Sequence, residues 1–434
     1  MLKRASVLTV VVTLSVAWSL GPAEVAYTQR QPDPPGRPGQ PPGRVPQDFG
    51  VEPGEVLVQF RPGATGQEVA ALHRQQGGQE VDAIPELDVR VVRVPPGQEV
   101  AQAAAYGRNP TVRFAEPNRR YRHASHGTND PDVGRQWQYN SPANDADIDA
   151  FEAWHVTTGA ASVRIAVLDS GIDLSHEDLK SKVVGAKSFI RGRTSIEDAY
   201  GHGTHVAGSA AAVTDNARGV AGTCPACSLL NGKVLGDDGF GADSTVASGI
   251  VWATDNGAKV ISMSLVNYYA SQTVREAVDR AWQRGVVLVA AAGNDGGDYG
   301  AYPAAFDHVI AVGATDRNDR RWPSSNYGWW VDVAAPGAEV YSTAPDHANR
   351  MFGTGVKYGT LSGTSMATPH AAGVAGLVWA GGRCTTNACV RDRLEDCSDK
   401  EVNGTGPDYS GAPVSFWAHG RINANRAVGT AGCS

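Results

Sequence analysis

Short apolar runs alternate with helix-like segments through the larger part of the chain, from about residue 122 onward. The runs cover residues 163–168, 229–234, 260–265 and 286–291. Between them, apolar residues recur at helical spacing, and Gly257 and Gly285 end two of these stretches. Strands without a polar face are buried on both sides, and strands separated by helices pair in parallel. The pattern predicts an α/β domain of three layers with a mainly parallel central sheet.

A smaller unit precedes this domain and has a different pattern. Its predicted elements are a strand at 55–60, a helix at 67–76, a short strand around Val81, a strand at 89–94, a helix at 98–106 and a strand at 112–115. The order strand, helix, strand, strand, helix, strand is the split βαβ arrangement. We therefore expect a small α+β domain of the ferredoxin-like kind.

The N-terminus carries the pattern of an export signal. Two basic residues, Lys3 and Arg4, precede an apolar-leaning stretch at 5–20, and small residues follow at positions 21, 23 and 26. A membrane anchor is the alternative, but serine and threonine interrupt a run already shorter than the roughly 20 apolar residues of a span. We predict a signal peptide that is removed, so that the protein is secreted and extracellular and keeps no membrane contact.

The segments after the signal peptide give the expected domain order. Residues 27–50 are rich in proline and glycine and predict an extended linker. The full prediction is a signal peptide at 1–26, a linker at 27–50, a small domain at 51–121 and a large domain at 122–434.

Cysteine content and charge narrow the possible partners. Six cysteines, at 224, 227, 384, 389, 397 and 433, form an even set in an exported chain and predict disulfides of open connectivity. Cys224 and Cys227 also fit half a zinc site or a redox pair, but no second such pair accompanies them, so we interpret them as structural. The net charge of −7 comes without a basic stripe, which argues against a nucleic acid partner.

Four polar residues stand where chemistry is possible. Asp169 follows an apolar run, His202 lies between glycines at a helix start, Asn294 leaves another run through a glycine, and Ser365 opens an apolar helix at 366–379. Each has an ordinary structural explanation. Asp169 and Asn294 are common turn residues, Ser365 is a good helix cap, and His202 with His205 resembles a structural or metal pair.

A common catalytic role also explains all four residues. A serine is inert until a base takes its proton, and a histidine base needs a carboxylate to fix its tautomer. A serine at a helix N-terminus lies at the positive end of the dipole, beside free backbone N–H groups. The amide of Asn294 and the N–H of Ser365 then form an oxyanion hole.

The motifs around these residues resemble the subtilisin family, and thermitase-like members in particular. They are Val167-Leu-Asp-Ser-Gly-Ile-Asp173, Gly201-His-Gly-Thr-His-Val-Ala-Gly208, Ala291-Ala-Gly-Asn294 and Leu361-Ser-Gly-Thr-Ser-Met-Ala-Thr-Pro-His370, in the order of the family. The resemblance spans about residues 129–428, and the unit at 51–121 resembles the inhibitory propeptide of the family. It implies a subtilisin-like fold and a secreted serine endopeptidase, made as a zymogen that cuts itself between Tyr121 and Asn129.

The resemblance also implies a role for each residue. Asp169 orients His202, His202 acts as base and then acid, Ser365 is the nucleophile, and Asn294 donates to the oxyanion. The partners are protein and peptide substrates and the chain's own propeptide, and the enzyme is expected to be a monomer. The implied substrate-binding residues form two short segments, Ser264, Leu265 and Val266 on one side and Ala292 and Gly293 on the other.

Two positions depart from the family or bear on its specificity. Val266 and Asn267 stand where the family usually carries glycine, and their bulk is expected to narrow the outer subsites. Asp295 lies beside the pocket, where it either favours basic substrate side chains or is only a solvated loop carboxylate.

A structural calcium site is implied as well. Its oxygen ligands suit the six to eight hard ligands of calcium, and they are the side chains of Asp130, Asp178 and Asn216 with the carbonyls of Val213, Arg218 and Val220. The second site of thermitase is not implied, because residues 189–196 lack its acidic character. The tail at 416–427 resembles the last helix of the family, and Cys397 is expected to pair with Cys433.

Three other functions remain to be weighed against a secreted protease. A binding protein that kept the fold and lost the reaction would show a damaged catalytic residue, and none is visible. A serine-carboxyl peptidase shares the Ser-Gly-Thr-Ser phrase but lacks the histidine motif at 201–208. An intracellular processing enzyme fits neither the leader nor the propeptide.

Overall fold

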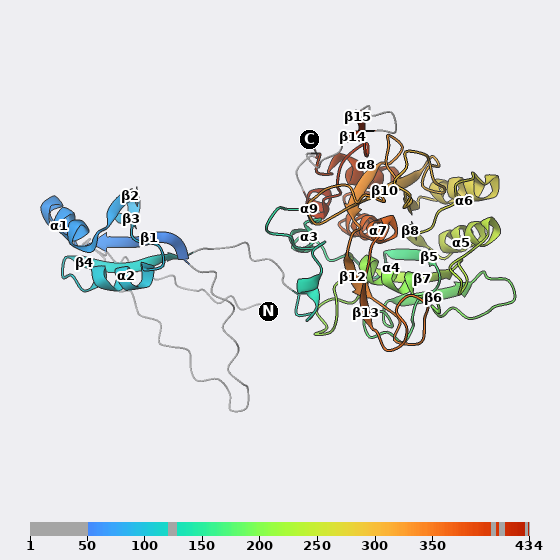
Figure 1. Ribbon diagram of the computed structural model, residues 1–434, viewed down its shortest axis with the longest axis horizontal. Coiled ribbons are helices and arrows are strands. Elements are labelled where there is room, and N and C mark those ends of the chain that lie inside the picture. The colour runs from blue at the N-terminus through green and yellow to red at the C-terminus, as the bar shows by residue number, and fades with distance from the viewer. Residues whose placement is uncertain (1–50, 120–127, 401–404, 408–412, 430–432, 434) are drawn as a thin grey trace, which may run out of the picture. The chain divides into compact units, whose positions relative to one another are not determined.

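The computed structural model describes residues 51–119, 128–400, 405–407, 413–429 and 433. The chain divides into two compact units, with the boundary between residues 122 and 123 (Figure 1). The predicted signal peptide, the linker and most of the predicted cleavage segment lie outside the described residues. No helix among the described residues is long and apolar enough to cross a membrane.

The N-terminal unit is a four-stranded antiparallel sheet with two helices, as the sequence predicts. Its strand order is β2-β3-β1-β4. The N-cap Thr65 and Glu68 exchange hydrogen bonds at the start of α1, and Gly77 ends this helix with φ +66°. The elements are β1 (Val51–Phe60), α1 (Gly66–Gln76), β2 (Gln79–Ile84), the 3₁₀ turn η1 (Pro85–Leu87), β3 (Val89–Arg93), α2 (Glu99–Gly107) and β4 (Val112–Arg119).

The larger unit is built on a seven-stranded sheet in the order β11-β10-β9-β8-β5-β7-β6, with every pair parallel. The four apolar runs of the sequence become its central strands β5, β7, β8 and β9, which confirms the predicted parallel sheet. The strands are β5 (Arg164–Asp169), β6 (Val183–Ser188), β7 (Ser228–Lys233), β8 (Ala258–Met263), β9 (Val287–Ala291), β10 (Val309–Thr315) and β11 (Val333–Pro336). Two short antiparallel pairs join β12 (Val340–Thr343) to β13 (Tyr358–Leu361) and β14 (Thr405–Pro407) to β15 (Pro413–Ser415).

Helices cover both faces of this sheet and make three layers (Figure 1). Alternate residues of β5 show this clearly, since Ile165 and Val167 pack with α4 and α7, whereas Ala166 and Leu168 pack with α5 and α6. The helices are η2 (Val133–Arg135), α3 (Ala150–Trp154), α4 (His202–Ala211), α5 (Asp243–Asp255), α6 (Gln272–Gln283), α7 (Thr364–Ala380), α8 (Asn387–Asp396) and α9 (Ala424–Val428).

The C-terminal region differs from the expected helix at 416–427, because only α9 at its end is helical. The residues before α9 instead make contacts with distant parts of the chain. Trp417 is buried against Ala292, Val331 and Ala334. Arg421 pairs with Asp399 at 2.9 Å and with Asp319 at 3.1 Å. These long-range contacts fix the segment in a non-helical path.

The cysteines form three disulfides, which join Cys224 to Cys227, Cys384 to Cys389 and Cys397 to Cys433. The last pair is the one that the sequence analysis expects. Both sulfurs of the first pair belong to fully buried residues packed in the core, which agrees with a structural role.

Candidate active site

The candidate residues come from three elements that meet near one edge of the sheet. Asp169 is the last residue of β5, which lies between β7 and β8 in the sheet. His202 is the first residue of α4, and Ser365 is the second residue of α7. The carboxyl edge of a parallel sheet is where open α/β folds place their sites.

Asp169 and His202 are in direct contact. Nδ1 of His202 lies 2.8 Å and 3.0 Å from the two carboxylate oxygens of Asp169. The carboxylate side chain is 1% exposed and the imidazole 15% exposed. A Cβ on Gly203 would stand 2.2 Å from the carbonyl oxygen of Gly171, so glycine allows α4 to approach the strand end. With a proton held on Nδ1, the imidazole offers Nε2 as a base.

The surroundings of His202 raise its pKa. Burial opposes the charged imidazolium and is the largest single effect. The charge and hydrogen bond of Asp169, together with the charge of Asp198, outweigh it. The site therefore favours a histidine that accepts a proton readily.

Asp198 organises the turn that leads into α4, and it is not among the residues predicted from the sequence. It is fully buried and accepts hydrogen bonds from the hydroxyl of Ser170 at 2.8 Å, the N–H of Gly201 at 2.7 Å and the N–H of Thr204 at 2.8 Å. An aspartate shortly before a predicted helix start often caps the helix, and this pattern is the sequence signal that points to Asp198. Asp198 thus holds the residues on both sides of His202.

Ser365 lies in the first turn of α7, but it is not the cap of this helix. The N-cap is Gly363, and no side chain bonds there. Ser365 and Ser264 join the start of α7 to the segment after β8 through two hydrogen bonds. Ser264 Oγ donates to the Ser365 carbonyl at 2.8 Å, and Ser365 Oγ donates to the Ser264 carbonyl at 3.3 Å. Among the described residues, the Ser365 hydroxyl bonds Ser264 and not His202. Rotation about χ1 of Ser365 is the motion that redirects it, and catalytic hydrogen bonds are often loose without substrate.

The amide of Asn294 is oriented by Thr364. Its Oδ1 accepts from both the N–H and the hydroxyl of Thr364, each at 2.9 Å. This arrangement leaves Nδ2 as a donor. The Cβ that a side chain at Gly363 would add lies 3.4 Å from this Nδ2 and 3.7 Å from the backbone nitrogen of Ser365. Two donors therefore converge on one region beside the serine, as an oxyanion hole requires.

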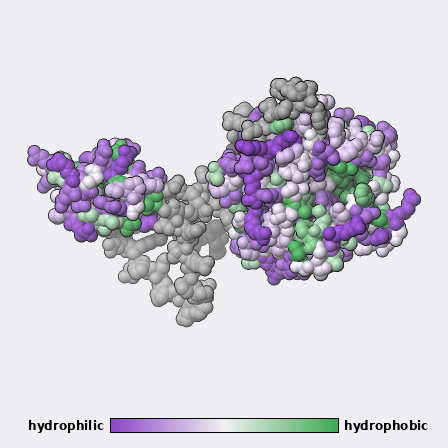
Figure 2. Space-filling model, in the orientation of Figure 1, coloured by the Kyte–Doolittle hydropathy of each residue, from purple (hydrophilic) through white to green (hydrophobic). Residues whose placement is uncertain are grey.

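A cleft of about 460 Å³ runs beside these residues. Figure 2 shows apolar side chains gathered on this face of the larger unit, near α5 and α6. Ser264, Leu265 and Val266 follow β8 and line the cleft, and Ala292 and Gly293 follow β9. Further lining residues include His202, Leu235, Val246, Val274, Asn294 and Phe306.

The carboxylate of Asp295 is not isolated. Its Oδ2 accepts a hydrogen bond from the hydroxyl of Tyr268, a residue on the opposite segment. The structure therefore gives Asp295 a partner within the chain, rather than leaving its charge free for a basic substrate side chain.

The residues expected to bind calcium lie in one hydrogen-bonded cluster. Asp130, which is 2% exposed, accepts from the N–H groups of Asp215 at 2.9 Å and Asn216 at 3.1 Å. Oδ1 of Asn216 accepts from the N–H of Arg218 at 2.8 Å. Asp130 therefore binds the loop at 213–220 through two backbone N–H groups.

Asp178 meets the same loop from the other side. It is fully buried and accepts from Asn216 Nδ2 at 2.7 Å, the N–H of Val220 at 3.2 Å and the hydroxyl of Tyr358 at 2.9 Å, while its carbonyl accepts from the N–H of Val213 at 2.9 Å. Burial raises the pKa of Asp178 despite these hydrogen bonds. A buried carboxylate whose hydrogen-bond donors are all uncharged fits a calcium ion, which would supply the missing positive charge. For the side-chain oxygen of Asn216 to bind the ion next to Asp178, the amide group must flip, because Nδ2 now faces that carboxylate.

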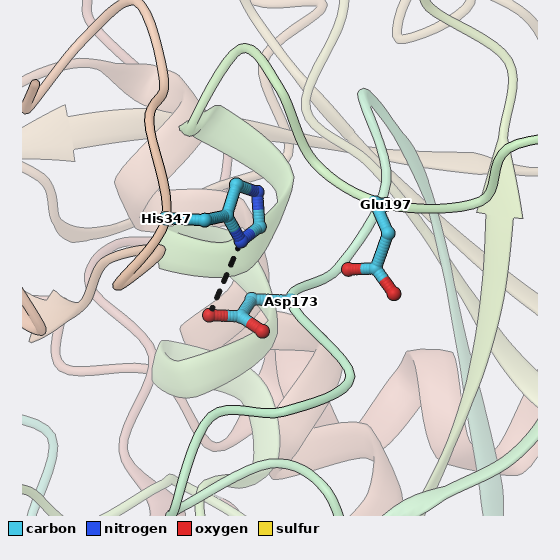
Figure 3. Close-up of side chains that lie close together, drawn as sticks. All are labelled: Asp173, Glu197 and His347. Carbon is cyan, nitrogen blue, oxygen red and sulfur yellow. Dashed lines mark ion pairs between the residues drawn. The ribbon is translucent and has the colours of Figure 1, made fainter. Parts of the chain in front are cut away.

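A separate group of three side chains lies next to the turn before α4 and was not predicted. Figure 3 shows Asp173, Glu197 and His347, each with a ligand atom within 4.8 Å of the others. Nδ1 of His347 is 3.7 Å from Asp173, and its Nε2 lies 3.0 Å from the carbonyl of Asp198. Both oxygens of Asp173 already accept hydrogen bonds, from Ser175 and Asp346.

Of these three residues, His347 belongs to the segment between β12 and β13, which contacts the turn before α4. Arg350 and Met351 donate backbone hydrogen bonds to the carbonyls of Ala199 at 3.2 Å and Tyr200 at 3.0 Å. Nothing in the local sequence predicts these contacts, since the two segments lie about 150 residues apart. We interpret His347 and Asp173 as residues that hold the loop before His202 in position.

Comparison with known proteins agrees with this geometry. The Subtilase family matches residues 160–410, and the fervidolysin N-terminal prodomain matches residues 49–118. Thermitase from Thermoactinomyces vulgaris is 45% identical over 281 residues, which cover 65% of this chain and 93% of thermitase. The thermophilic serine proteinase of Bacillus sp. (strain AK1) is 39% identical over 380 residues, or 86% of this chain and 87% of that protein. A solved protease from Pseudoalteromonas arctica PAMC 21717 has a TM-score of 0.61 at 31% identity and covers 69% of this chain and 98% of its own.

Proposed function

The chain belongs to the subtilase family of serine proteases and carries an N-terminal prodomain, and we propose that it is a secreted endopeptidase that works through an acyl-enzyme on Ser365. The observation that carries the proposal is the contact of Asp169 with His202 at 2.8 Å, together with Ser365 in the first turn of α7 and Asn294 bound to Thr364 at the start of that helix. Secretion rests on the signal peptide predicted from the sequence.

In the acylation step, Ser365 Oγ attacks the carbonyl carbon of the scissile peptide bond. His202 takes the hydroxyl proton on Nε2, while Asp169 holds the proton on Nδ1 and stabilises the imidazolium. Asn294 Nδ2 and the N–H of Ser365 donate to the carbonyl oxygen as it becomes negative. The C–N bond breaks when His202 passes its proton to the leaving amine, and the acyl group remains as an ester on Ser365.

In the deacylation step, water replaces the departed amine. His202 removes a proton from the water as it attacks the ester carbonyl, and the same oxyanion donors stabilise the second tetrahedral intermediate. Collapse releases the carboxylic acid, and His202 returns the proton to Ser365. Protein and peptide backbones enter as an added strand beside Ser264, Leu265 and Val266, with Ala292 and Gly293 on the other side.

The proposal is tested by digesting a mixture of peptides of varied sequence with the mature protein. We expect internal peptide bonds to be cut at neutral to alkaline pH, and a serine-directed covalent inhibitor to stop the reaction. Activity with an acid optimum that resists the inhibitor would instead indicate a serine-carboxyl peptidase.

The prodomain is proposed to be an intramolecular inhibitor. It forms a compact unit of its own, and the cleavage region expected from the sequence, between Tyr121 and Asn129, spans the boundary between the two units. We propose that the catalytic unit cuts this region itself, so that the protein is made as a zymogen.

Replacing Asn294 with leucine is expected to lower kcat by about 100-fold to 1000-fold, the effect known for the corresponding asparagine of subtilisin. KM should change little, because the amide stabilises the oxyanion more than the bound peptide. Steady-state kinetics on a peptide anilide measure both constants. The matched control is Asn318→Leu, a change in an exposed turn, and an equal loss of kcat in both variants would contradict the oxyanion role.

A structural calcium ion is proposed at Asp130, Asp178 and Asn216, with the carbonyls of Val213, Arg218 and Val220. The ion would supply positive charge to two buried carboxylates and fix the loop at 213–220. Chelation should lower the melting temperature of the mature enzyme by roughly 5 °C or more, since a ligand at 100 times its Kd adds about 2.7 kcal/mol. Calorimetry with and without chelator measures this, and Asp178→Asn should lose the response. If chelation leaves the melting temperature of the wild type unchanged, the proposed calcium site is wrong.

A further inference from the structure

We propose that Asp173, Glu197 and His347 bind a divalent transition-metal ion such as zinc, which joins three segments of the chain around the loop before His202. This site is distinct from the proposed calcium site, because it shares no residue with it and offers a nitrogen ligand. The inference goes beyond the proposed protease function and does not depend on it.

The three side chains come from remote parts of the sequence and lie close together (Figure 3). Asp173 follows β5, Glu197 lies in the loop before α4, and His347 lies between β12 and β13. Each offers one ligand atom, and these atoms all lie within 4.8 Å of one another. The fold therefore gathers two carboxylates and an imidazole, a set of ligands that zinc accepts.

The hydrogen bond of His347 leaves its other ring nitrogen available to an ion. Nε2 lies 3.0 Å from the carbonyl oxygen of Asp198, and because a carbonyl oxygen only accepts, Nε2 carries the proton. In the neutral ring, Nδ1 then has a lone pair, and it lies 3.7 Å from Asp173 Oδ2. Histidines that bind metals typically donate their other N–H to a backbone carbonyl or a carboxylate. His347 is therefore oriented as a ligand through Nδ1.

The gap between His347 and Asp173 has the size of a metal site rather than of a hydrogen bond. A distance of 3.7 Å is too long for an N–H···O bond, whereas two ligand atoms each about 2.1 Å from a tetrahedral ion lie about 3.4 Å apart. Oδ1 of Asp173 accepts two hydrogen bonds from Ser175. Oδ2, which faces His347, accepts one among the described residues, from the N–H of Asp346 at 3.1 Å, and keeps a lone pair for an ion.

Basic side chains do not balance the negative charge at this place. Within the part of the chain that the structure describes, neither Asp173 nor Glu197 forms an ion pair with lysine or arginine. Asp198 is fully buried, and its hydrogen bonds come from uncharged donors. The ammonium of Lys233 bonds the Glu197 carbonyl at 3.1 Å, but its charge is paired with Asp237 at 3.0 Å. A divalent cation would supply the missing positive charge.

The site is open to solvent on one side, and its ligands select the kind of ion. The His347 side chain is 36% exposed and Glu197 is exposed, whereas the Asp173 side chain is fully buried. Glu197 can therefore rotate toward an ion, and a water molecule completes four ligands. An imidazole nitrogen suits zinc, nickel or copper, whereas calcium takes oxygen ligands. We expect zinc to bind here even in excess calcium.

The test is isothermal titration calorimetry with zinc chloride on the mature enzyme, blocked by a serine-directed inhibitor and kept in excess calcium. We expect one zinc ion per molecule. His347→Ala should weaken this binding at least about 100-fold, because even the loss of a partner behind a metal ligand costs about 10-fold to 100-fold in affinity. Glu197→Gln changes an exposed side chain with little effect on its shape and should also weaken binding, so a folding defect in one variant does not decide the result.

The matched control is His155→Ala, which removes an exposed histidine at the end of α3, outside the group of three. It should bind zinc as the wild type does. Zinc held elsewhere, for instance by His202, would survive His347→Ala. The inference is overturned if the wild type binds no zinc, if His347→Ala keeps the wild-type affinity, or if His155→Ala loses it. Failure of the protease proposal would leave peptides intact without changing these titrations.

Discussion

Replacing Ser365 with alanine is expected to lower kcat by about a million-fold, the size of effect known for the corresponding serine of subtilisin. The physical reason is that the methyl group cannot form the ester on which the two-step reaction depends. The fold should survive, because the cap of α7 is Gly363 and the lost hydrogen bond to Ser264 is long, at 3.3 Å. Single-turnover kinetics on a peptide anilide, together with a thermal unfolding curve, measure both effects.

The control for this variant is Ser362→Ala, three residues earlier, in the turn that leads from β13 into α7. Ser362 is exposed and its hydroxyl accepts a hydrogen bond from Glu339 N at 2.8 Å, away from the proposed reaction. It should keep near wild-type turnover. A purified Ser365→Ala precursor should also remain uncut, and processing of this precursor without added protease would refute autocatalytic maturation.

Replacing Asp169 with asparagine is expected to lower kcat by about ten-thousand-fold. The amide no longer fixes the proton on Nδ1 of His202 and no longer stabilises the imidazolium. The pH profile should change as well. In the wild type, kcat/KM rises with pH as His202 loses its proton, and its raised pKa places this rise above the ordinary value of about 6.5.

Loss of Asp169 removes the largest of the effects that raise this pKa, and burial then favours the neutral ring. The rise in the residual activity of Asp169→Asn should therefore move to lower pH than in the wild type. Asp307→Asn is the control, since this side chain is 90% exposed, and its profile should be that of the wild type. A rise at the same pH in Asp169→Asn and wild type would contradict the pairing of Asp169 with His202.

The parts of the fold that the sequence predicts best are those set by local patterns. The runs around Ile165 and Leu230 are nearly continuous in apolar residues, which favours burial on both faces, and the structure places them in β5 and β7. In the prodomain, the helix expected at 67–76 is present as α1, with Thr65 as its N-cap and Gly77 at its C-terminal end. The helix expected at 416–427 is largely absent, because Trp417 and Arg421 find distant partners that outweigh local preference.

The same distinction between local patterns and long-range contacts applies to the candidate site. Asp169, His202, Asn294 and Ser365 stand in long motifs, and the structure brings Asp169 to His202 and Asn294 to the start of α7. The residues that the sequence analysis missed act through contacts between remote segments. His347 reaches Asp198 across 149 positions, and Tyr268 reaches Asp295 across 27. Such contacts depend on how loops fold back, which no local period or spacing encodes.

The central claim is that the hydroxyl of Ser365 carries the acyl group. It is tested most directly by treating the mature enzyme with phenylmethanesulfonyl fluoride and locating the adduct by peptide mass spectrometry while residual activity is followed. The account predicts one adduct per molecule, on Ser365, with activity lost in proportion to labelling. Full activity in enzyme labelled at Ser365, or inactivation that tracks an adduct on another residue, would contradict it.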